Sequence, residues 1–523
     1  MNETKEFNLL SFSYSEVIRF LLKNSPISWI ADLRFSRRCS YVEFLKIIQT
    51  VSLNLENNIL SSKDIVHFIG PNNLALWAGY FGIVFNDWIP VGSSENLSLG
   101  ELEKNITKTK SSGLLINEKL WDTFRKNLSV GSLKIVFVYG VTETGDFKMD
   151  IRKIVLSNPC IKTIFDKRKF RAMSLMFLTS GSCGEPKSVM VNHSSFLEIV
   201  ILQANIFKKL KKEVKRTFIA CISLSNSGGI LDIFMGLQNQ QNMVILEKFE
   251  PRLYLDTFVK YNCNYLAVTP AMLNSLAKFD LIGDYNFSSS VVSILCGGSK
   301  VNLNSVNIIK IKTKMADNVE FFELYGSSEC PFTHLTKSNI NSLKRYLEPP
   351  VSPIRCKIMS LDNEFECKPS EDGELWINSP FTMIGYFADD AETKAVLTND
   401  GWYKTGDIAH FDDEGNLHIS GRIKDLIKYK AFSLNSEEIE DALLRHPLIN
   451  LVSVIGKPHE EFGEIPVAVL ERSSAVTKCD VVQYASKHLE EHNRIHDVYF
   501  VDKIPLNDGN KVDRQALTTF IKF

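Results

Sequence analysis

The sequence predicts an α/β protein, with a large N-terminal body of mostly parallel β-sheets flanked by helices and a small α+β domain at the C-terminus. The 523 residues are too many for one compact core. Short apolar runs alternate with amphipathic stretches along most of the chain, as parallel strands covered by helices do. Past about residue 360 the pattern changes to a hairpin, a helix and further strands, which indicates a second, smaller domain.

The elements of the N-terminal body are predicted from apolar runs and helical periodicity. Residues 74–92 form the longest apolar stretch, but Asn86 and Asp87 interrupt it. This stretch is therefore predicted to be a buried helix that runs into a strand, not a membrane span. The other predicted strands are 132–140, 173–178 and 290–298, and the other predicted helices are 16–24, 196–210 and 253–262.

The C-terminal elements follow the same logic. GNLHISGR (415–422) has the pattern of a hairpin strand, and EEIEDALLRHP (437–447) that of a helix stopped by proline. Residues 449–458 and 465–472 are predicted strands. The change of character places the boundary near residues 421–428, which gives domains 1–424 and 425–523.

Composition excludes several classes of function. Sixty basic side chains balance 61 acidic ones, so nothing favours a nucleic-acid partner. The ten cysteines contain no C-x-x-C pair, which argues against a zinc site. The N-terminal residues lack a secretory pattern and the chain ends in FIKF, not a peroxisomal tripeptide. We therefore expect a cytoplasmic protein without a transmembrane segment, and the oligomeric state stays open.

The segment FLTSGSCGEPKSVMVNH (177–193) concentrates glycines, small hydroxyls and one lysine. A strand is predicted before it and a helix after it, an arrangement in which backbone N–H groups and hydroxyls can face phosphate oxygens. The spacing does not fit a Walker P-loop, and by itself the segment could equally be a turn. The candidate phosphate-binding residues are Thr179, Ser180, Gly181, Ser182, Cys183, Gly184 and Lys187.

Further motifs follow this segment in a fixed order. They are YGSSE (325–329), GEL (373–375), GWYKTGD (401–407), GRIKDLIKYK (421–430) and PLNDGNKVDR (505–514). In this order and at these separations the set resembles the adenylate-forming superfamily. Its members include acyl-CoA synthetases, 4-coumarate–CoA ligases, beetle-type luciferases and stand-alone adenylation enzymes. The resemblance runs from about residue 40 to 517 and is greatest to the 4-coumarate–CoA ligase and luciferase branch.

The resemblance implies an AMP-forming acid–thiol ligase that works in two steps. A carboxylate, fatty or aromatic, first attacks the α-phosphate of Mg·ATP and forms an acyl-adenylate. A thiol acceptor, usually coenzyme A, then displaces AMP to form a thioester. The C-terminal domain is implied to be a mobile lid that rotates between the two steps.

The resemblance also assigns roles to residues on the nucleotide side. The loop with Lys187 would hold the β- and γ-phosphates, Tyr325 would stack on adenine, and Ser328 would contact the α-phosphate. Glu329 would bind Mg²⁺. Asp407 would accept the ribose hydroxyls, with Arg422 as an additional donor. The turn residues Gly298 and Ser299 would border the adenine and the acyl group, and Gly326 belongs to the ATP/AMP-binding set.

A second group of residues belongs to the acyl, thiol and hinge functions. Asn226, where relatives carry histidine, and Gly229 fall in the acyl pocket. Lys430 and Ala431 lie on the coenzyme A side. Asp425 is the implied hinge. The lysine expected on the carboxylate and α-phosphate is Lys511, a catalytic residue together with Lys187 and Glu329.

The chain departs from the family pattern at Cys183, Ser188, Asn226, Ala431 and Asn510. Three functions therefore stay open: an acid–thiol ligase, a luciferase-like oxygenase that uses the adenylate, and a catalytically degenerate paralogue that binds nucleotide or acyl ligand. The lack of Asp in residues 225–230 argues against an α-amino acid substrate. The sequence does not identify the acid.

Overall fold

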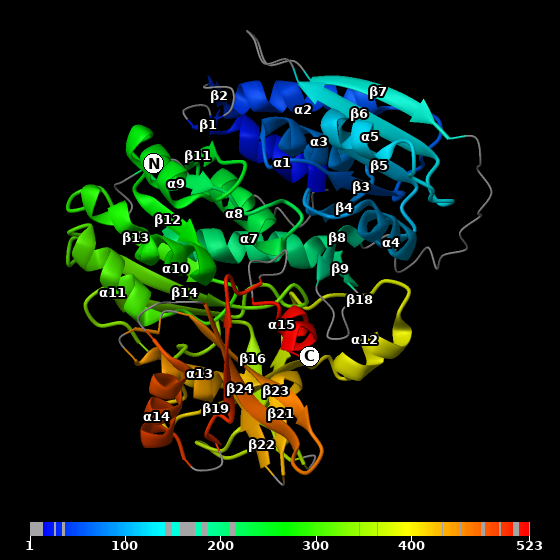
Figure 1. The fold of residues 1–523 in the computed structure, drawn as a ribbon. Coiled ribbons are helices and arrows are strands. Elements are labelled where there is room, and N and C mark those ends of the chain that lie inside the picture. Colours follow the sequence, from blue (N-terminus) through cyan, green and yellow to red (C-terminus); the bar gives the residue numbers. More distant parts are fainter. Residues whose placement is uncertain are drawn as a thin grey trace. The chain divides into compact units, whose positions relative to one another are not determined.

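The computed structural model describes most of the chain, with gaps. The described residues are 14–25, 28–33, 37–141, 149–156, 173–179, 186–208, 215–344, 346–362, 365–430, 432–446, 448–449, 451–471, 476–490, 493–505 and 512–521. The chain forms two compact units. The first includes Pro186–Leu343 and Pro380–Lys394 with the N-terminal part of the chain, and the second contains Lys344–Ser379 and most of Ala395–Phe523. Each unit is described by itself (Figure 1).

The largest sheet of the first unit has eight strands in the order β18-β9-β8-β4-β3-β5-β6-β7. Its centre is parallel and both edges are antiparallel. The strand bounds are β3 (Ile65–Ile69), β4 (Ile89–Ser93), β5 (Gly113–Asn117), β6 (Ile135–Val141), β7 (Met149–Val155), β8 (Met173–Thr179), β9 (Lys187–Asn192) and β18 (Gly385–Tyr386).

Both faces of this sheet are covered by helices, which explains the uninterrupted apolar runs of its strands. On β5, Leu114 and Ile116 pack with residues of α4 (Leu99–Thr109) and α5 (Glu118–Phe124). Leu115, which points the other way, lies against Gly79 of α3 (Leu74–Phe85), where a Cβ would come within 2.5 Å of it. The stretch 74–92 is therefore a buried helix followed by strand β4, as predicted.

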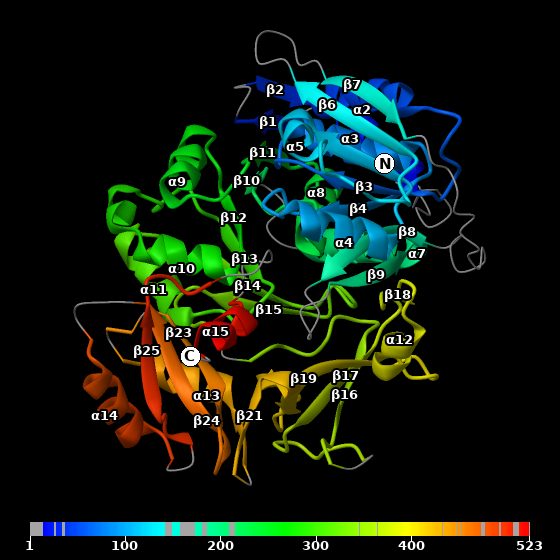
Figure 2. The same cartoon turned by 45° about the vertical axis from the view of Figure 1, so that its right-hand side comes forward.

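Two four-stranded sheets complete the first unit, in the orders β10-β11-β1-β2 and β12-β13-β14-β15. In each, three strands are parallel and the last is antiparallel. Figure 2 shows the second of these sheets beside helices α10 and α11. The strands are β1 (Trp29–Asp32), β2 (Arg37–Ser40), β10 (Thr217–Ala220), β11 (Asn242–Ile245), β12 (Tyr265–Val268), β13 (Ser293–Gly297), β14 (Glu320–Tyr325) and β15 (His334–Asn339).

Helices of the first unit begin at caps that the sequence carries. Ser40 and Glu43 form a capping box at the start of α2 (Tyr41–Leu55), and Ser98 and Glu101 form one at α4. The remaining helices are α1 (Tyr14–Lys23), α7 (His193–Lys208), α8 (Ser227–Gln238), α9 (Pro251–Lys260), α10 (Pro270–Lys278), α11 (Leu303–Lys312), α12 (Asp390–Val396, which passes into the second unit) and the short 3₁₀ helix η2 (Asp280–Asp284). The predicted helices 16–24, 196–210 and 253–262 correspond to α1, α7 and α9 and are confirmed.

The second unit contains two sheets. One is antiparallel, in the order β16-β17-β19-β20, and the other has the order β22-β21-β24-β23, with β25 parallel to β24. The strands are β16 (Arg355–Met359), β17 (Gly373–Asn378), β19 (Tyr403–Phe411), β20 (Leu417–Arg422), β21 (Leu426–Tyr429), β22 (Phe432–Asn435), β23 (Val452–His459), β24 (Gly463–Glu471) and β25 (Asp497–Val501). The helical elements are η3 (Ile423–Asp425), α13 (Ser436–Leu444), α14 (Lys478–His488) and α15 (Arg514–Ile521).

The fold class is thus confirmed: parallel sheets between helices occupy the first unit, and an α+β arrangement forms the C-terminal part. The boundary between residues 424 and 425 stays a prediction. Among the helices that the structure describes, none combines the length and the apolar character that a membrane crossing requires.

Candidate nucleotide-binding and acyl-binding residues

The glycine-rich segment connects two strands, not a strand and a helix. Thr179 ends β8 and Lys187 begins β9, and the two residues are paired across this antiparallel hairpin. Helix α7 begins only at His193, after the whole of β9. The expected strand–turn–helix arrangement is therefore wrong, since the apolar run after Lys187 is a strand of the large sheet. The N-terminus of helix α7 therefore does not directly follow the loop, and Lys187 lies at the start of a strand.

Several predicted site residues lie outside the described part of the chain. They are Ser180, Gly181, Ser182, Cys183, Gly184, Ala431 and Lys511. Their predicted roles stay predictions. The structure does describe residues next to them. These are Thr179 and Lys187, which flank the loop, and Lys430 on the coenzyme A side.

Lys187 and Glu329 are connected through one tyrosine. The hydroxyl of Tyr386 donates a 2.9 Å hydrogen bond to Oε1 of Glu329, and the Lys187 ammonium lies 4.9 Å from the centre of the same ring. Strand β18 carries Tyr386 and pairs with β9, which carries Lys187. Burial and then the Glu329 carboxylate raise the pKa of the Tyr386 hydroxyl well above its ordinary value, so it remains a donor. The two predicted catalytic side chains thus lie on one small cluster.

Lys187 also forms an ion pair that a phosphate could replace. Its Nζ lies 2.5 Å from Oε2 of Glu392, whose side chain is 49% exposed. An ion pair with one well-solvated partner contributes only about 0–1 kcal/mol. A phosphate group with more negative charge can therefore take the place of the Glu392 carboxylate at low cost.

Glu329 retains an oxygen for a metal. Tyr386 bonds Oε1 of Glu329, and among the described residues no side chain hydrogen-bonds Oε2. The same residues include no group of three or more His, Cys, Asp or Glu side chains that could hold a metal ion. Mg²⁺ does not need such a cage, because it commonly binds one or two carboxylates together with substrate phosphates and water. A single carboxylate beside a phosphate-binding lysine therefore fits Mg²⁺.

The predicted adenine-side residues lie at the carboxyl ends of two adjacent parallel strands. Gly297, the last residue of β13, is paired with Leu324 of β14, so Gly298 and Tyr325 follow at the same sheet edge. Ligands of α/β sheets bind at such edges. Gly298 has φ = +98°, which permits the turn there, and both it and Ser299 are exposed. The ring of Tyr325 makes an edge contact with His334 at 5.7 Å.

The turn after Tyr325 requires its glycine. A Cβ on Gly326 would lie 2.6 Å from the backbone of Pro331. Ser327 closes the turn, because its N–H donates to the Cys330 carbonyl at 3.0 Å. Ser328 and Glu329 thus lie on a short, closely packed loop.

This loop contacts the start of helix α8, where the acyl-side residues lie. The hydroxyls of Ser227 and Ser328 are 3.3 Å apart. Asn226 occupies the N-cap position of α8, but its side chain makes no capping hydrogen bond. Its amide is therefore available to a ligand. Gly229 packs so closely on residues 222 and 223 that a Cβ would lie 2.2 Å from the Ser223 carbonyl oxygen, so a packing requirement alone explains this glycine.

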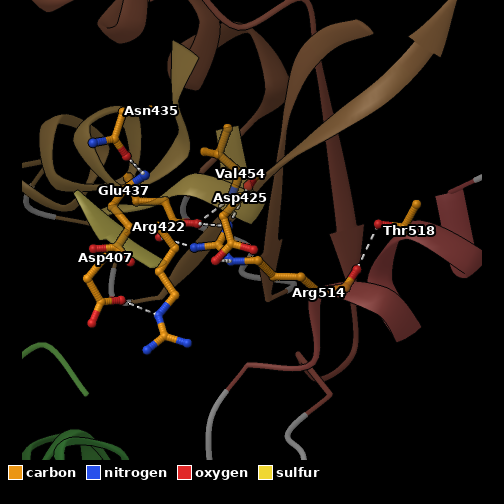
Figure 3. Close-up of polar contacts among 9 residues, drawn as sticks. Asp407, Arg422, Asp425, Asn435, Glu437, Val454, Arg514 and Thr518 are labelled. Carbon is orange, nitrogen blue, oxygen red and sulfur yellow. Dashed lines mark hydrogen bonds and ion pairs between the residues drawn. The ribbon is translucent and has the colours of Figure 1, made fainter. Parts of the chain in front are cut away.

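Asp407 and Arg422 face one another across β19 and β20 in the second unit. They are paired residues, and the Arg422 Nε lies 2.6 Å from Oδ1 of Asp407 (Figure 3). The Asp407 side chain is 6% exposed and that of Arg422 is 40% exposed. The arginine thus fixes one carboxylate oxygen and leaves the guanidinium accessible, as a site for a sugar with several hydroxyls requires.

Asp425 and Lys430 lie on either side of β21. Asp425 ends the 3₁₀ turn η3, and Oδ2 of its carboxylate is 3.7 Å from Nε of Arg514. Lys430 has φ = +54°, and its ammonium lies 4.6 Å from the ring centre of Phe462. A chain reversal at Lys430 connects β21 and β22.

Sequence reasoning did not identify Tyr386, Glu392 or Ser227. Tyr386 belongs to a two-residue strand whose pairing with β9 spans almost 200 positions, so no local pattern marks it. Ser227 lies beside Asn226, but only the tertiary fold brings it to Ser328. Each of these residues carries polar groups that face a predicted site residue.

The fold and these side chains define a class: an ATP-binding α/β enzyme with a separate C-terminal α+β part, of the adenylate-forming kind. The family assignment is direct. The model of the AMP-binding enzyme family matches residues 24–387, and that of the AMP-binding enzyme C-terminal domain matches residues 438–511. The chain belongs to the AMP-binding enzyme family. The predicted superfamily and the predicted class of acid–thiol ligase are confirmed.

Curated relatives cover nearly the whole chain. "Probable CoA ligase CCL5" from Humulus lupulus is 25% identical over 93% of this chain and 89% of its own length. "4-coumarate--CoA ligase-like 6" from Arabidopsis thaliana is 26% identical over 91% of this chain and 85% of its own. "Peroxisomal OPC-8:0-CoA ligase 1" from the same plant is 24% identical, over 93% and 89%.

Solved structures agree in fold. ATP-bound MatB from Rhodopseudomonas palustris superposes with a TM-score of 0.79 at 19% identity, covering 97% of this chain and 99% of that one. The o-succinylbenzoate coenzyme A synthetase of Bacillus subtilis in complex with ATP and magnesium ion superposes with a TM-score of 0.77 at 19% identity, over 96% and 98%. The amide bond synthetase McbA from Marinactinospora thermotolerans gives 0.79 at 20% identity, over 97% and 99%.

Proposed function

We propose that this chain forms an acyl-adenylate from ATP and a fatty or aromatic carboxylic acid, and then passes the acyl group to coenzyme A. ATP, Mg²⁺ and coenzyme A as cofactors are supported by the family assignment and by the coenzyme A ligases among the relatives. The observation that carries the proposal is the cluster of Lys187, Tyr386 and Glu329, which joins a cation and a carboxylate at the hairpin of the glycine-rich loop.

Lys187 and Glu329 would act on the phosphates of ATP. The ammonium of Lys187 can exchange the Glu392 carboxylate for a phosphate oxygen and so neutralise charge on the β- and γ-phosphates. Glu329, held by Tyr386 through one oxygen, would offer the other to Mg²⁺. When bound, the metal screens the phosphates and makes pyrophosphate a better leaving group.

Asp407 and Arg422 would bind the ribose. The Asp407 carboxylate is oriented by Arg422, so its second oxygen can accept hydrogen bonds from sugar hydroxyls. The guanidinium, which is more exposed, can donate to the same sugar. These contacts would hold ATP and the adenylate alike, and so affect affinity more than the rate of the chemical step.

The proposed acid is a fatty or an aromatic carboxylic acid. One relative is named as 4-coumarate–CoA ligase-like and another as an OPC-8:0-CoA ligase. Asn226 supplies a neutral amide next to Ser227, which contacts Ser328, and residues 225–230 include no carboxylate that could pair with an α-ammonium group. An uncharged acyl chain or aromatic ring fits this environment best. A cytoplasmic location stays a prediction.

An exchange assay tests the proposal. The purified chain is incubated with ATP, Mg²⁺, labelled pyrophosphate and one acid at a time, from short to long fatty acids and from benzoate to hydroxycinnamates. We expect acid-dependent exchange for at least one member. Absence of exchange with every acid, together with measurable ATP binding, would overturn the proposal in favour of the degenerate binding protein.

The acceptor is tested with the acid that supports exchange. We expect an acyl-CoA product after coenzyme A is added, detected by mass spectrometry. A product formed only with an amine would show an amide synthetase, the activity in the name of McbA. Oxygen consumption with light emission and no thioester would show a luciferase-like oxygenase. Either result would replace coenzyme A as the proposed acceptor.

A further inference from the structure

Helix α8 leads from the loop of Ser328 and Glu329 to a carboxyl group deep in the first unit. The hydroxyl of Ser227, the first residue of α8, lies 3.3 Å from that of Ser328. Asp232 is on the same helix, and its distance in sequence from Ser227 corresponds to a rise of about 7.5 Å. The start of α8 is thus in contact with the proposed metal loop, and Asp232 lies further along the helix.

The Asp232 carboxyl has no polar compensation. Burial raises its pKa to about 7, and among the described residues neither a hydrogen bond nor a cation lowers it. The residue is nevertheless only half-buried, whereas its neighbours Leu231 and Ile233 are buried. A desolvated carboxyl that is still partly accessible borders a space that the surrounding side chains do not fill. Because buried polar groups in folded proteins nearly always have partners, a ligand is the expected partner here.

The same face of α8 is open at Gly228. This glycine precedes Asp232 by four positions, so the two residues lie one above the other on the helix. A Cβ on Gly228 would meet only Cγ2 of Ile222, at an ordinary contact distance of 3.9 Å. Gly229, by contrast, is packed against backbone. The structure therefore leaves room beside α8 on the face that carries Gly228 and Asp232.

Neutral hydrogen-bonding groups surround Asp232. Burial first, and then the Asp232 carboxylate, raise the pKa values of the Cys221 thiol and the Tyr265 hydroxyl, so both groups lie near it. After burial, Asp232 is also among the groups that raise the pKa of Tyr254 on α9. Tyr254 is 0% exposed, and among the described residues its hydroxyl has no hydrogen-bond partner. The guanidinium of Arg216 lies 5.3 Å from the centre of the Tyr265 ring.

We propose that Asp232 determines which acids are activated, by accepting a hydrogen bond from a hydroxyl at the far end of the acyl group. The inference rests on the proposed function and narrows its class of acid to fatty or aromatic acids with a terminal hydroxyl. The carboxylate of such an acid lies at the loop of Ser328 and Glu329, and its hydroxyl reaches Asp232. A hydroxyl suits this position better than an ammonium group, because it donates a hydrogen bond without burying a second charge.

Matched pairs of acids test the inference in ATP–pyrophosphate exchange. The longer pairs are ω-hydroxyoctanoate with octanoate, and para-hydroxyphenylpropanoate with phenylpropanoate. The pair of γ-hydroxybutyrate and butyrate is too short to reach Asp232. A hydrogen bond to a charged group favours its donor by about tenfold to a hundredfold. We expect the wild type to show a preference of this size, in kcat/KM, for the hydroxylated member of a longer pair and none within the short pair.

Three variants separate recognition from packing. Asp232→Leu removes the acceptor at similar size, so the preference for the hydroxylated acid should disappear, while exchange with the unhydroxylated acid persists. Asp232→Asn keeps one acceptor oxygen and should retain part of the preference. Asp256→Leu is the matched control, because it makes the same change on α9, where Asp256 is exposed and accepts from the Tyr285 hydroxyl at 2.6 Å. Its preference should equal that of the wild type.

The pH dependence is a readout that a packing role would not change. Asp232 is more fully ionised at pH 8 than at pH 6, and a charged acceptor forms the stronger hydrogen bond. The preference should therefore increase from pH 6 to pH 8 in the wild type and stay constant in Asp232→Asn. The ratio between two acids cancels pH effects that both share. Cys221, Tyr254 and Tyr265 stay neutral over this range, because their pKa values are raised.

The outcomes distinguish this inference from the proposed function. A preference that survives Asp232→Leu, or a wild type that favours the unhydroxylated acid in both longer pairs, would overturn the inference alone. Absence of exchange with every acid would contradict the proposed function. Calorimetric titration of the same pairs into the wild type and Asp232→Leu would then decide the inference by binding. If circular dichroism showed that Asp232→Leu does not fold, Asp232→Asn and its pH profile would decide it.

Discussion

Replacing Asp407 by asparagine tests the proposed ribose contact with a nearly isosteric change. Arg422 donates to Oδ1 of Asp407 at 2.6 Å, so the amide of the variant must turn its carbonyl oxygen to the arginine. The amide NH₂ then occupies the position where the second carboxylate oxygen would accept from the sugar. The variant therefore loses at least one hydrogen bond between a hydroxyl and a charged group.

The size of the effect follows from the contacts. A hydrogen bond to a charged group is worth about 1.5–3 kcal/mol, and a loss of about 2 kcal/mol corresponds to a rise of roughly 30-fold in the KM for ATP. The ion pair itself has one partly exposed partner, so we expect no more than about 1 kcal/mol of stability to be lost. The kcat of exchange should stay close to the wild-type value, because the ribose contact is the same in the ground and transition states.

Asp412→Asn is the matched control on the same hairpin. Asp412 accepts from Nε2 of His418 at 3.0 Å, so this change also removes a carboxylate from a pair with a basic side chain. The assay is ATP–pyrophosphate exchange at varied ATP, with thermal unfolding of each variant. We expect the KM for ATP to rise only in Asp407→Asn. An unchanged KM in that variant, or an equal rise in both, would refute the ribose assignment.

Three further predictions concern other residues. Glu329→Gln should raise the Mg²⁺ concentration that ATP–pyrophosphate exchange requires, because a hard anionic ligand is lost. Tyr386→Phe keeps the Glu329 carboxylate and should raise this concentration less. An unchanged Mg²⁺ requirement in Glu329→Gln would contradict the metal role. Lys511→Ala should reduce exchange by about a hundredfold while ATP affinity and acyl transfer from a supplied adenylate persist; exchange that ignores the change would mean that another group supplies the charge. Burial lowers the pKa of His67 to about 3, so the unfolded chain takes up its proton first and stability should fall as the pH drops below about 6.5. His67→Gln removes this titrating group. The difference in the free energy of unfolding between the wild type and the variant, measured with urea, should therefore become smaller from pH 7 to pH 5. A difference that stays constant would show that His67 does not titrate in this way.

The sequence by itself determined the fold class and the family. Periodicity located α1, α7, α9 and the helix–strand stretch 74–92, because those segments bury a continuous apolar face or are buried entirely. The ordered motifs identified the adenylate-forming superfamily without any information on interatomic distances. Ordered motifs identify a family because one shared ligand requires each glycine, hydroxyl or charged group at a given place in the sequence.

Only the tertiary structure decided which side chains meet. The strand character of the residues after Lys187 was missed, because the buried middle of a strand and the start of an apolar helix have the same local pattern. The partners of the predicted charges come from distant positions: Tyr386 reaches Glu329 through β18, and Arg514 reaches Asp425 and Glu440 across the second unit. Long-range contacts of this kind depend on sheet order and helix packing, which the local sequence does not encode. For that reason the motifs identify the reacting groups, whereas the side chains that orient them become visible only when the sheets are assembled.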